Sequence, residues 1–222
     1  MRALFVLLCL LLILSLVSSA PPSWIVSIGY STATSTHCAG TLLNREWLVT
    51  SADCVRHAAT TSELRVFAGC SAGATTNCSS VHHVASTFVH PCFIETAGSN
   101  DLALVRLMSP GVTMGTATRY PILPSVDGVT VRDYTATSDT AVVYAWGSMP
   151  GAPLRNKTLP FLSASTCRAK FLELDGTYST SLDFVTPRSV CVGTGLGQSS
   201  DNDVLPCQGH TDVGTPLVQS NM

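Results

Sequence analysis

The segment THCAGTLLNREWLVTSADCV, residues 36–55, carries the strongest local signal in the chain. Apolar and β-branched residues at 41–43 and 47–50 flank a polar turn at 44–46, and a cysteine stands near each end. Two such runs around a short polar turn predict a pair of antiparallel strands. The segment therefore predicts a hairpin that begins near Cys38 and is followed by Cys54.

A second informative stretch is NDLALVRL at residues 100–107. Taken alone, its aspartate, Asp101, is the turn residue that opens a buried strand. Because this stretch follows the first segment, Asp101 is also a candidate functional residue.

The two stretches, in this order and near this spacing, resemble the trypsin/chymotrypsin-like serine proteases. In that family a cysteine-containing strand is followed by W-V-L-T-A-A-H-C and later by N-D-I-A-L-I-K-L. The resemblance implies an all-β fold of two antiparallel barrels. It places Asp101 at the family's catalytic aspartate and Asp53, in Ser51-Ala52-Asp53-Cys54, at the position of the catalytic histidine.

The nucleophile should lie in the segment that resembles C-Q-G-D-S-G-G-P-L-V-C, which here reads CQGHTDVGTPLVQ at 207–219. Counted from Cys207, the family's serine position is Thr211. Anchored on the later proline, it is Val213, and we favour this alignment because Asp212 and Gly214 then match. Neither alignment supplies a serine.

Other family positions in the same region are also altered. The oxyanion hole would use the backbone N–H of Gly209, but an insertion before the nucleophile would pull its donors apart. The specificity pocket carries Leu205 where trypsins carry an aspartate. The positions of one family disulfide correspond to Ala141 and Gln219, so both of its cysteines are missing together.

The segment SWIVSIGY, residues 23–30, predicts an apolar strand that resembles the family's P-W-Q-V-S-L. The residue directly before Ile25 is Trp24 and not a lysine or arginine, so we do not expect Ile25 to be an activated N-terminus. The segment that would carry the family's buried α-amino group is therefore expected to be absent. The chain also ends soon after Gln219, so we expect the second barrel to be C-terminally incomplete, through truncation of the product or of the gene sequence.

Composition excludes several classes of function. The chain has 222 residues, 12% of them charged, and a net charge of −2 with no basic run. A nucleic-acid partner and an electrostatic membrane anchor are therefore not expected. We expect no cofactor and no metal, because the histidines have no ligand spacing with the aspartates.

The N-terminus predicts a signal peptide over residues 1–19. Arg2 precedes an apolar run at 3–17, and small residues follow up to Ala20. A retained anchor is the alternative, but the run of about 15 residues is shorter than the roughly 20 that span a bilayer. We expect a secreted, extracellular protein with a trypsin-like domain at 20–222, divided into barrels at about 20–118 and 119–222.

Cleavage of the signal peptide removes Cys9 and leaves eight of the nine cysteines, an even number that suggests disulfides in a secreted chain. The expected pairs are Cys38–Cys54, Cys70–Cys78 across a polar loop, and Cys167–Cys191, which the resemblance implies. Cys92 and Cys207 either pair with each other or leave a free thiol. Sequons at Asn77 and Asn156 are candidate glycosylation sites.

A serine protease needs a hydroxyl nucleophile, a base and a carboxylate that orients the base. Since two of these three positions are altered, the leading hypothesis is a protease homologue without activity that binds a protein: a protease, an inhibitor or a surface ligand. The alternative is an atypical endopeptidase using Thr211, or an active protease with a misassembled sequence. A third possibility is a degenerate product with no selected function.

Overall fold

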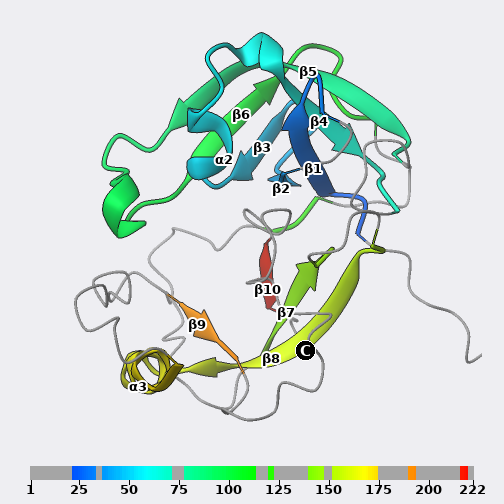
Figure 1. The fold of residues 1–222 in the computed structure, drawn as a ribbon. Coiled ribbons are helices and arrows are strands. Elements are labelled where there is room, and N and C mark those ends of the chain that lie inside the picture. The colour runs from blue at the N-terminus through cyan, green and yellow to red at the C-terminus, as the bar shows by residue number, and fades with distance from the viewer. Residues whose placement is uncertain are drawn as a thin grey trace, which may run out of the picture.

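The structure is a computed structural model that describes residues 22–33, 37–71, 78–113, 120–122, 140–147, 152–174, 190–193 and 216–219. Six antiparallel strands form a closed barrel in the order β1-β2-β3-β6-β5-β4 (Figure 1). Their bounds are β1 Ile25–Tyr30, β2 Cys38–Leu42, β3 Trp47–Thr50, β4 Leu64–Ala68, β5 Ser80–Val89 and β6 Ala103–Leu107. The hairpin predicted from the opening segment is β2 and β3.

The second half is a four-stranded antiparallel sheet in the order β10-β7-β8-β9. Its strands are β7 Thr140–Ala145, β8 Arg155–Leu162, β9 Cys191–Val192 and β10 Leu217–Gln219. The described helices are short apart from α3 Ala164–Leu174; they are α2 Asp53–Arg56, η1 Thr61–Glu63 and η3 Glu95–Ala97. The all-β prediction is confirmed.

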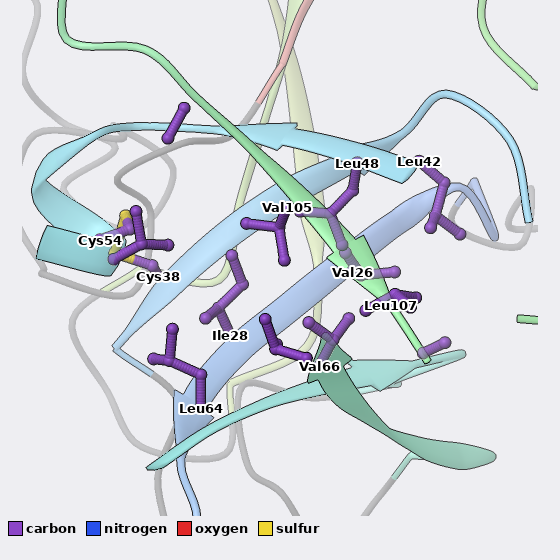
Figure 2. Close-up of a cluster of buried hydrophobic side chains, with 14 of the residues drawn as sticks. Val26, Ile28, Cys38, Leu42, Leu48, Cys54, Leu64, Val66, Val105 and Leu107 are labelled. Carbon is purple, nitrogen blue, oxygen red and sulfur yellow. A yellow bond between two sulfur atoms is a disulfide. The ribbon is translucent and has the colours of Figure 1, made fainter. Parts of the chain in front are cut away.

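The barrel interior is filled by alternate residues of its strands (Figure 2). In β6, Ala103, Val105 and Leu107 are each 1% exposed, whereas Leu104 and Arg106 point outward. The period of two follows from the pleat of a strand, which sends successive side chains to opposite faces. The aspartate before β6 is thereby fixed to a strand that the core holds in register.

The three expected disulfides are present: Cys38–Cys54, Cys70–Cys78 and Cys167–Cys191. Cys92 is exposed and takes no part in a disulfide within the described residues, and Cys207 lies outside them. Cys167 lies in α3, a helix that our sequence analysis did not predict. The hydroxyl of Ser163 accepts the N–H of Thr166 at 3.1 Å, which is the hydrogen bond of an N-cap residue.

The two halves meet through a small apolar cluster. Ile25 and Ala39 of the barrel pack with Trp146, which follows β7 and is 2% exposed. Trp24, just before β1, meets the ring of Tyr144 edge to face at a centroid distance of 6.1 Å. Residues 25–30 of the segment 23–30 form the barrel strand β1, and the amide of Ile25 donates to the carbonyl of Pro22 at 3.1 Å.

Strand β10 pairs with β7 in a register that places Gln219 opposite Ala141. These are the two positions where the sequence comparison expected both halves of a family disulfide to be missing. No helix in the described part of the chain is long and apolar enough to span a membrane. The predicted signal peptide at 1–19 lies outside the described residues.

The stability of the barrel should depend on pH through His82, which pairs with Val66 across β4 and β5. Burial lowers the pKa of His82 below its ordinary value of 6.5, and the like charge of the adjacent His83 adds to this. As the pH falls, His82 takes up a proton in the unfolded chain at a higher pH than in the folded protein. Neutral His82 therefore contributes fully to the free energy of unfolding above about pH 6.5, and this contribution is lost as the pH falls through the lower folded pKa.

We therefore expect the urea midpoint of His82→Gln to fall less than that of the wild-type protein between about pH 7.5 and pH 5.5. His83→Gln, at an exposed position on the same strand, is the matched control and should keep most of the wild-type pH dependence. Equal pH dependence in the wild type and His82→Gln would contradict the prediction.

Candidate functional site

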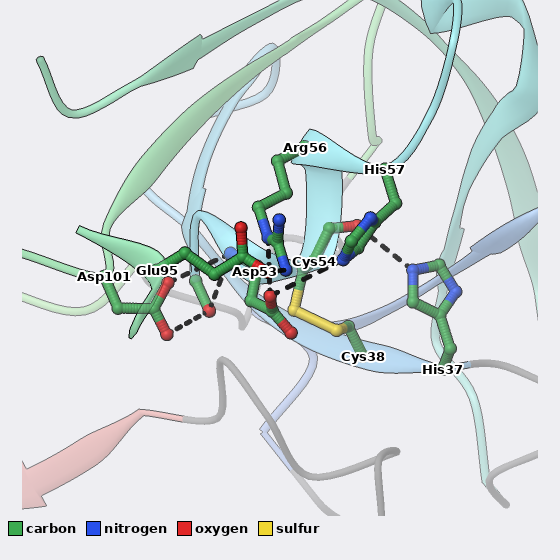
Figure 3. A network of polar contacts seen from close by, with 9 residues as sticks. His37, Cys38, Asp53, Cys54, Arg56, His57, Glu95 and Asp101 are labelled. Carbon is green, nitrogen blue, oxygen red and sulfur yellow. Dashed lines mark hydrogen bonds and ion pairs between the residues drawn. A yellow bond between two sulfur atoms is a disulfide. The ribbon is translucent and has the colours of Figure 1, made fainter. Parts of the chain in front are cut away.

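The candidate site lies where β3 ends and β6 begins (Figure 3). The two strands pair with Thr50 opposite Ala103. This register brings Ser51, the residue after β3, beside Asp101, which lies two residues before β6. Helix α2 starts at Asp53, and the disulfide Cys38–Cys54 ties its first turn to β2.

Asp101 accepts two hydrogen bonds from the segment 51–53. The Ser51 hydroxyl donates to Oδ2 at 2.5 Å, and the backbone N–H of Asp53 donates to Oδ1 at 3.0 Å. The same N–H also lies 3.2 Å from Ser51 Oγ. The carboxylate of Asp101 therefore binds the start of α2 and the residue before it.

The side chain of Asp53 is directed to different partners. Its Oδ1 accepts the Nε–H of Arg56 at 2.7 Å, and His57 Nε2 lies 3.8 Å from the same oxygen. Arg56 also donates to Glu95 of η3. The hydrogen bond to Asp53 raises the pKa of Arg56, which stays charged and joins two carboxylates from segments distant in sequence.

The structure thus brings together the two aspartates identified from the sequence, at 53 and 101, but not as a base and its orienting partner. Asp53 meets Asp101 through its backbone, while its half-exposed carboxylate forms an ion pair. His57 follows α2, is more than half exposed and faces Asp53. No group of three potential metal ligands occurs among the residues that the structure describes.

Three residues of the site were missed by the sequence analysis: Ser51, Arg56 and Glu95. A serine two positions before a helical aspartate and an arginine three positions after it are weak signals on their own. Other expected site residues, namely Leu205, Gly209, Thr211, Val213 and the sequon residue Asn77, lie outside the described residues. Asn156 is exposed on β8, opposite Tyr144 of β7.

A family model described as Trypsin matches residues 17–222, and the chain belongs to this family. The closed barrel and the second, partial sheet agree with the trypsin-like fold.

Curated relatives are similar at modest identity. Clotting factor C of Tachypleus tridentatus is 28% identical over 193 residues, which cover 82% of this chain but 18% of the relative. U21-ctenitoxin-Pn1a of Phoneutria nigriventer is 27% identical over 82% of this chain and 71% of its own length. The venom peptide isomerase heavy chain of Agelenopsis aperta is 24% identical over 88% and 77%. The chain thus spans less than a fifth of clotting factor C.

We expect Asp101→Ala to lower the free energy of unfolding by about 1–3 kcal/mol, because it removes the acceptor of a buried hydroxyl and a backbone N–H. Arg56→Gln is the control, since its ion pairs with Asp53 and Glu95 are exposed to solvent and should contribute less than the bonds to Asp101. Urea unfolding of the three proteins measures both changes. A smaller loss for Asp101→Ala than for Arg56→Gln would contradict the assigned role of Asp101.

Proposed function

We propose that this chain is a secreted member of the trypsin family without proteolytic activity, which acts by binding another protein. One observation carries the proposal: Asp101 is hydrogen-bonded to Ser51 and to the backbone of Asp53, with a carboxylate side chain at the position where we infer the family's histidine. That carboxylate is paired with Arg56.

The missing imidazole removes the proton transfer on which the family mechanism depends. In a serine protease the histidine takes the proton of the nucleophile and then gives it to the leaving amine, while the aspartate holds the ring in orientation. A carboxylate is a weak base at neutral pH. Oδ1 of Asp53 is also paired with Arg56.

The nucleophile positions support the same conclusion. We propose Val213 rather than Thr211 at the family's serine position. The register of β10 supports this, since Gln219 faces Ala141 as the alignment anchored on Pro216 requires. Valine carries no nucleophilic atom. Gly209 is proposed as the remaining oxyanion donor, and Leu205 in the specificity pocket would offer no charge to a basic substrate side chain.

The remaining features of the proposal concern processing. We propose a signal peptide at 1–19 and a trypsin-like domain at 20–222, with barrels at about 20–118 and 119–222. Three disulfides support passage through an oxidising compartment. Asn156 is proposed as a glycan acceptor because it lies on an exposed part of β8, and Asn77 is proposed from its sequon.

The second candidate function is an atypical serine-type endopeptidase that uses Thr211. Membership of the trypsin family favours it, but it needs a base within hydrogen-bond reach of the hydroxyl. The two hydrogen bonds that Asp101 accepts within the described residues come from a hydroxyl and a backbone N–H, neither of which is a base.

The intact mass of the secreted, deglycosylated protein should be unchanged by a fluorophosphonate probe, which labels activated serine and threonine nucleophiles. The expected N-terminus is Ala20, and the mass lost on deglycosylation reports the glycans at Asn77 and Asn156. An active trypsin treated in parallel should gain one adduct.

A stoichiometric adduct would overturn the inactive assignment. Thr211→Val would then identify the nucleophile, because loss of the adduct in this variant would assign it to Thr211. Retention of the adduct would assign it to a serine elsewhere in the chain.

The binding role predicts saturable association of the folded protein with a protein that recognises trypsin-like domains. We would measure binding of the immobilised chain to an active trypsin and to a protein inhibitor of trypsin. The reduced and unfolded chain is the control. Absence of saturable binding to both would contradict the protease and inhibitor classes of partner.

A further inference from the structure

We propose that Tyr144 binds the first sugar of an N-linked glycan at Asn156, so that an N-acetylglucosamine packs on the tyrosine ring. The inference rests on the proposed glycosylation of Asn156 and deepens it by naming the side chain that the sugar contacts. A glycan bound in this way ties β8 to β7 and stabilises the second sheet.

The register of β7 and β8 places Asn156 beside Tyr144. The two strands lie side by side (Figure 1), and Asn156 is the antiparallel partner of Tyr144. Residues directly opposite each other in antiparallel strands point to the same face of the sheet, with Cβ atoms about 4.5–5.5 Å apart. A sugar attached to the asparagine amide therefore starts next to the tyrosine ring.

The face that carries these two residues is the solvent-exposed face of the sheet. In β7, Val143 and Ala145 are 4% and 1% exposed, and Tyr144 between them points to the opposite face. In β8, the two residues that define the sequon, Asn156 and Thr158, are two positions apart and both exposed. The acceptor amide, the sequon hydroxyl and the tyrosine thus share one face.

The ring of Tyr144 is half-buried and is held in position by Trp24. The two rings meet edge to face, with centroids 6.1 Å apart and planes at 77°. Such a contact uses at most one face of the tyrosine ring. Trp24 therefore orients the ring without covering both of its faces.

The chemistry of N-acetylglucosamine suits an aromatic neighbour. The axial C–H groups of its ring form an apolar face, which packs on the electron-rich face of an aromatic side chain. Its hydroxyl and acetamide groups stay in water. The neighbours of Asn156 in β8, Arg155 and Lys157, point to the other face of the strand, so the cross-strand tyrosine is the side chain placed to bind the sugar.

A sugar held in this way connects three segments of the chain. It is bonded to β8, packs on β7 through Tyr144, and acts through that ring on Trp24, which precedes β1. Trp24 packs against the apolar cluster where the two halves meet. The glycan should therefore stabilise the folded protein, and a protein partner should bind a different face of the molecule.

The test is a double-mutant cycle in an Asn77→Gln background, on protein secreted by cells that attach high-mannose glycans. Endoglycosidase H leaves one N-acetylglucosamine on Asn156, and Asn156→Gln gives the unglycosylated form. Each form is made with Tyr144 and with Tyr144→Thr. We expect the sugar to raise the folding equilibrium constant, measured by urea unfolding, at least about twofold more with Tyr144 than with Tyr144→Thr.

The matched control is Tyr144→Phe, which loses the hydroxyl but keeps the ring and should keep the gain. An equal gain with Tyr144 and with Tyr144→Thr would overturn the inference. If Tyr144→Thr does not fold, NMR of isotope-labelled sugar on the protein with Tyr144 decides. The C–H protons of the N-acetylglucosamine should shift upfield relative to the urea-unfolded protein, because they lie over an aromatic ring, and unchanged shifts would overturn the inference equally.

The mass of the endoglycosidase-treated protein separates this inference from the proposals on which it rests. A mass without the single sugar would overturn both the glycan at Asn156 and its contact with Tyr144. An occupied Asn156 with equal gains would overturn the contact alone. None of these readouts measures proteolysis, so the inactive assignment stands or falls with the fluorophosphonate probe.

Discussion

The pairing of β3 with β6 is the contact on which the site and much of the barrel depend. It joins two strands whose neighbours at the site, Ser51 and Asp101, are 50 residues apart in sequence. Inside the barrel the same register aligns Leu48 with Val105, both at most 1% exposed. Side chains so closely packed allow little sliding, because a shift of one residue would turn the apolar face outward. The packing of the core therefore fixes the positions of Ser51 and Asp101 relative to each other.

The polar side chains of Ser51, Asp53 and Arg56 each have a hydrogen-bond partner in the described part of the chain. The carboxylate of Asp101 accepts the hydroxyl of Ser51 and the backbone N–H of Asp53. The carboxylate of Asp53 is paired with Arg56, which also donates to Glu95. The two aspartates therefore take part in one network with different partners for their side chains.

The parts of the structure that the sequence predicted are those governed by local pattern. The hairpin at 36–55 and the strand after Asp101 follow from runs of apolar residues around polar turns, and the family resemblance placed their order. Ser51 and Arg56 could not be recognised in the same way, because their partners are determined by strand register and by the direction of a loop rather than by neighbours in sequence. Helix α3 was not predicted because its sequence, ASTCRAKFLEL, has no clear division into an apolar and a polar face.

The three disulfides share a property that affects how the molecule responds to reduction. They close loops of 16, 8 and 24 residues, and each lies within one half of the described structure. Loop-closure entropy assigns each about 2.5–3.5 kcal/mol. Because none of them crosses between the barrel and the second sheet, a reductant would weaken the two halves separately. The association of the halves, through Trp24, Tyr144 and their neighbours, would persist for as long as those aromatic surfaces remain folded.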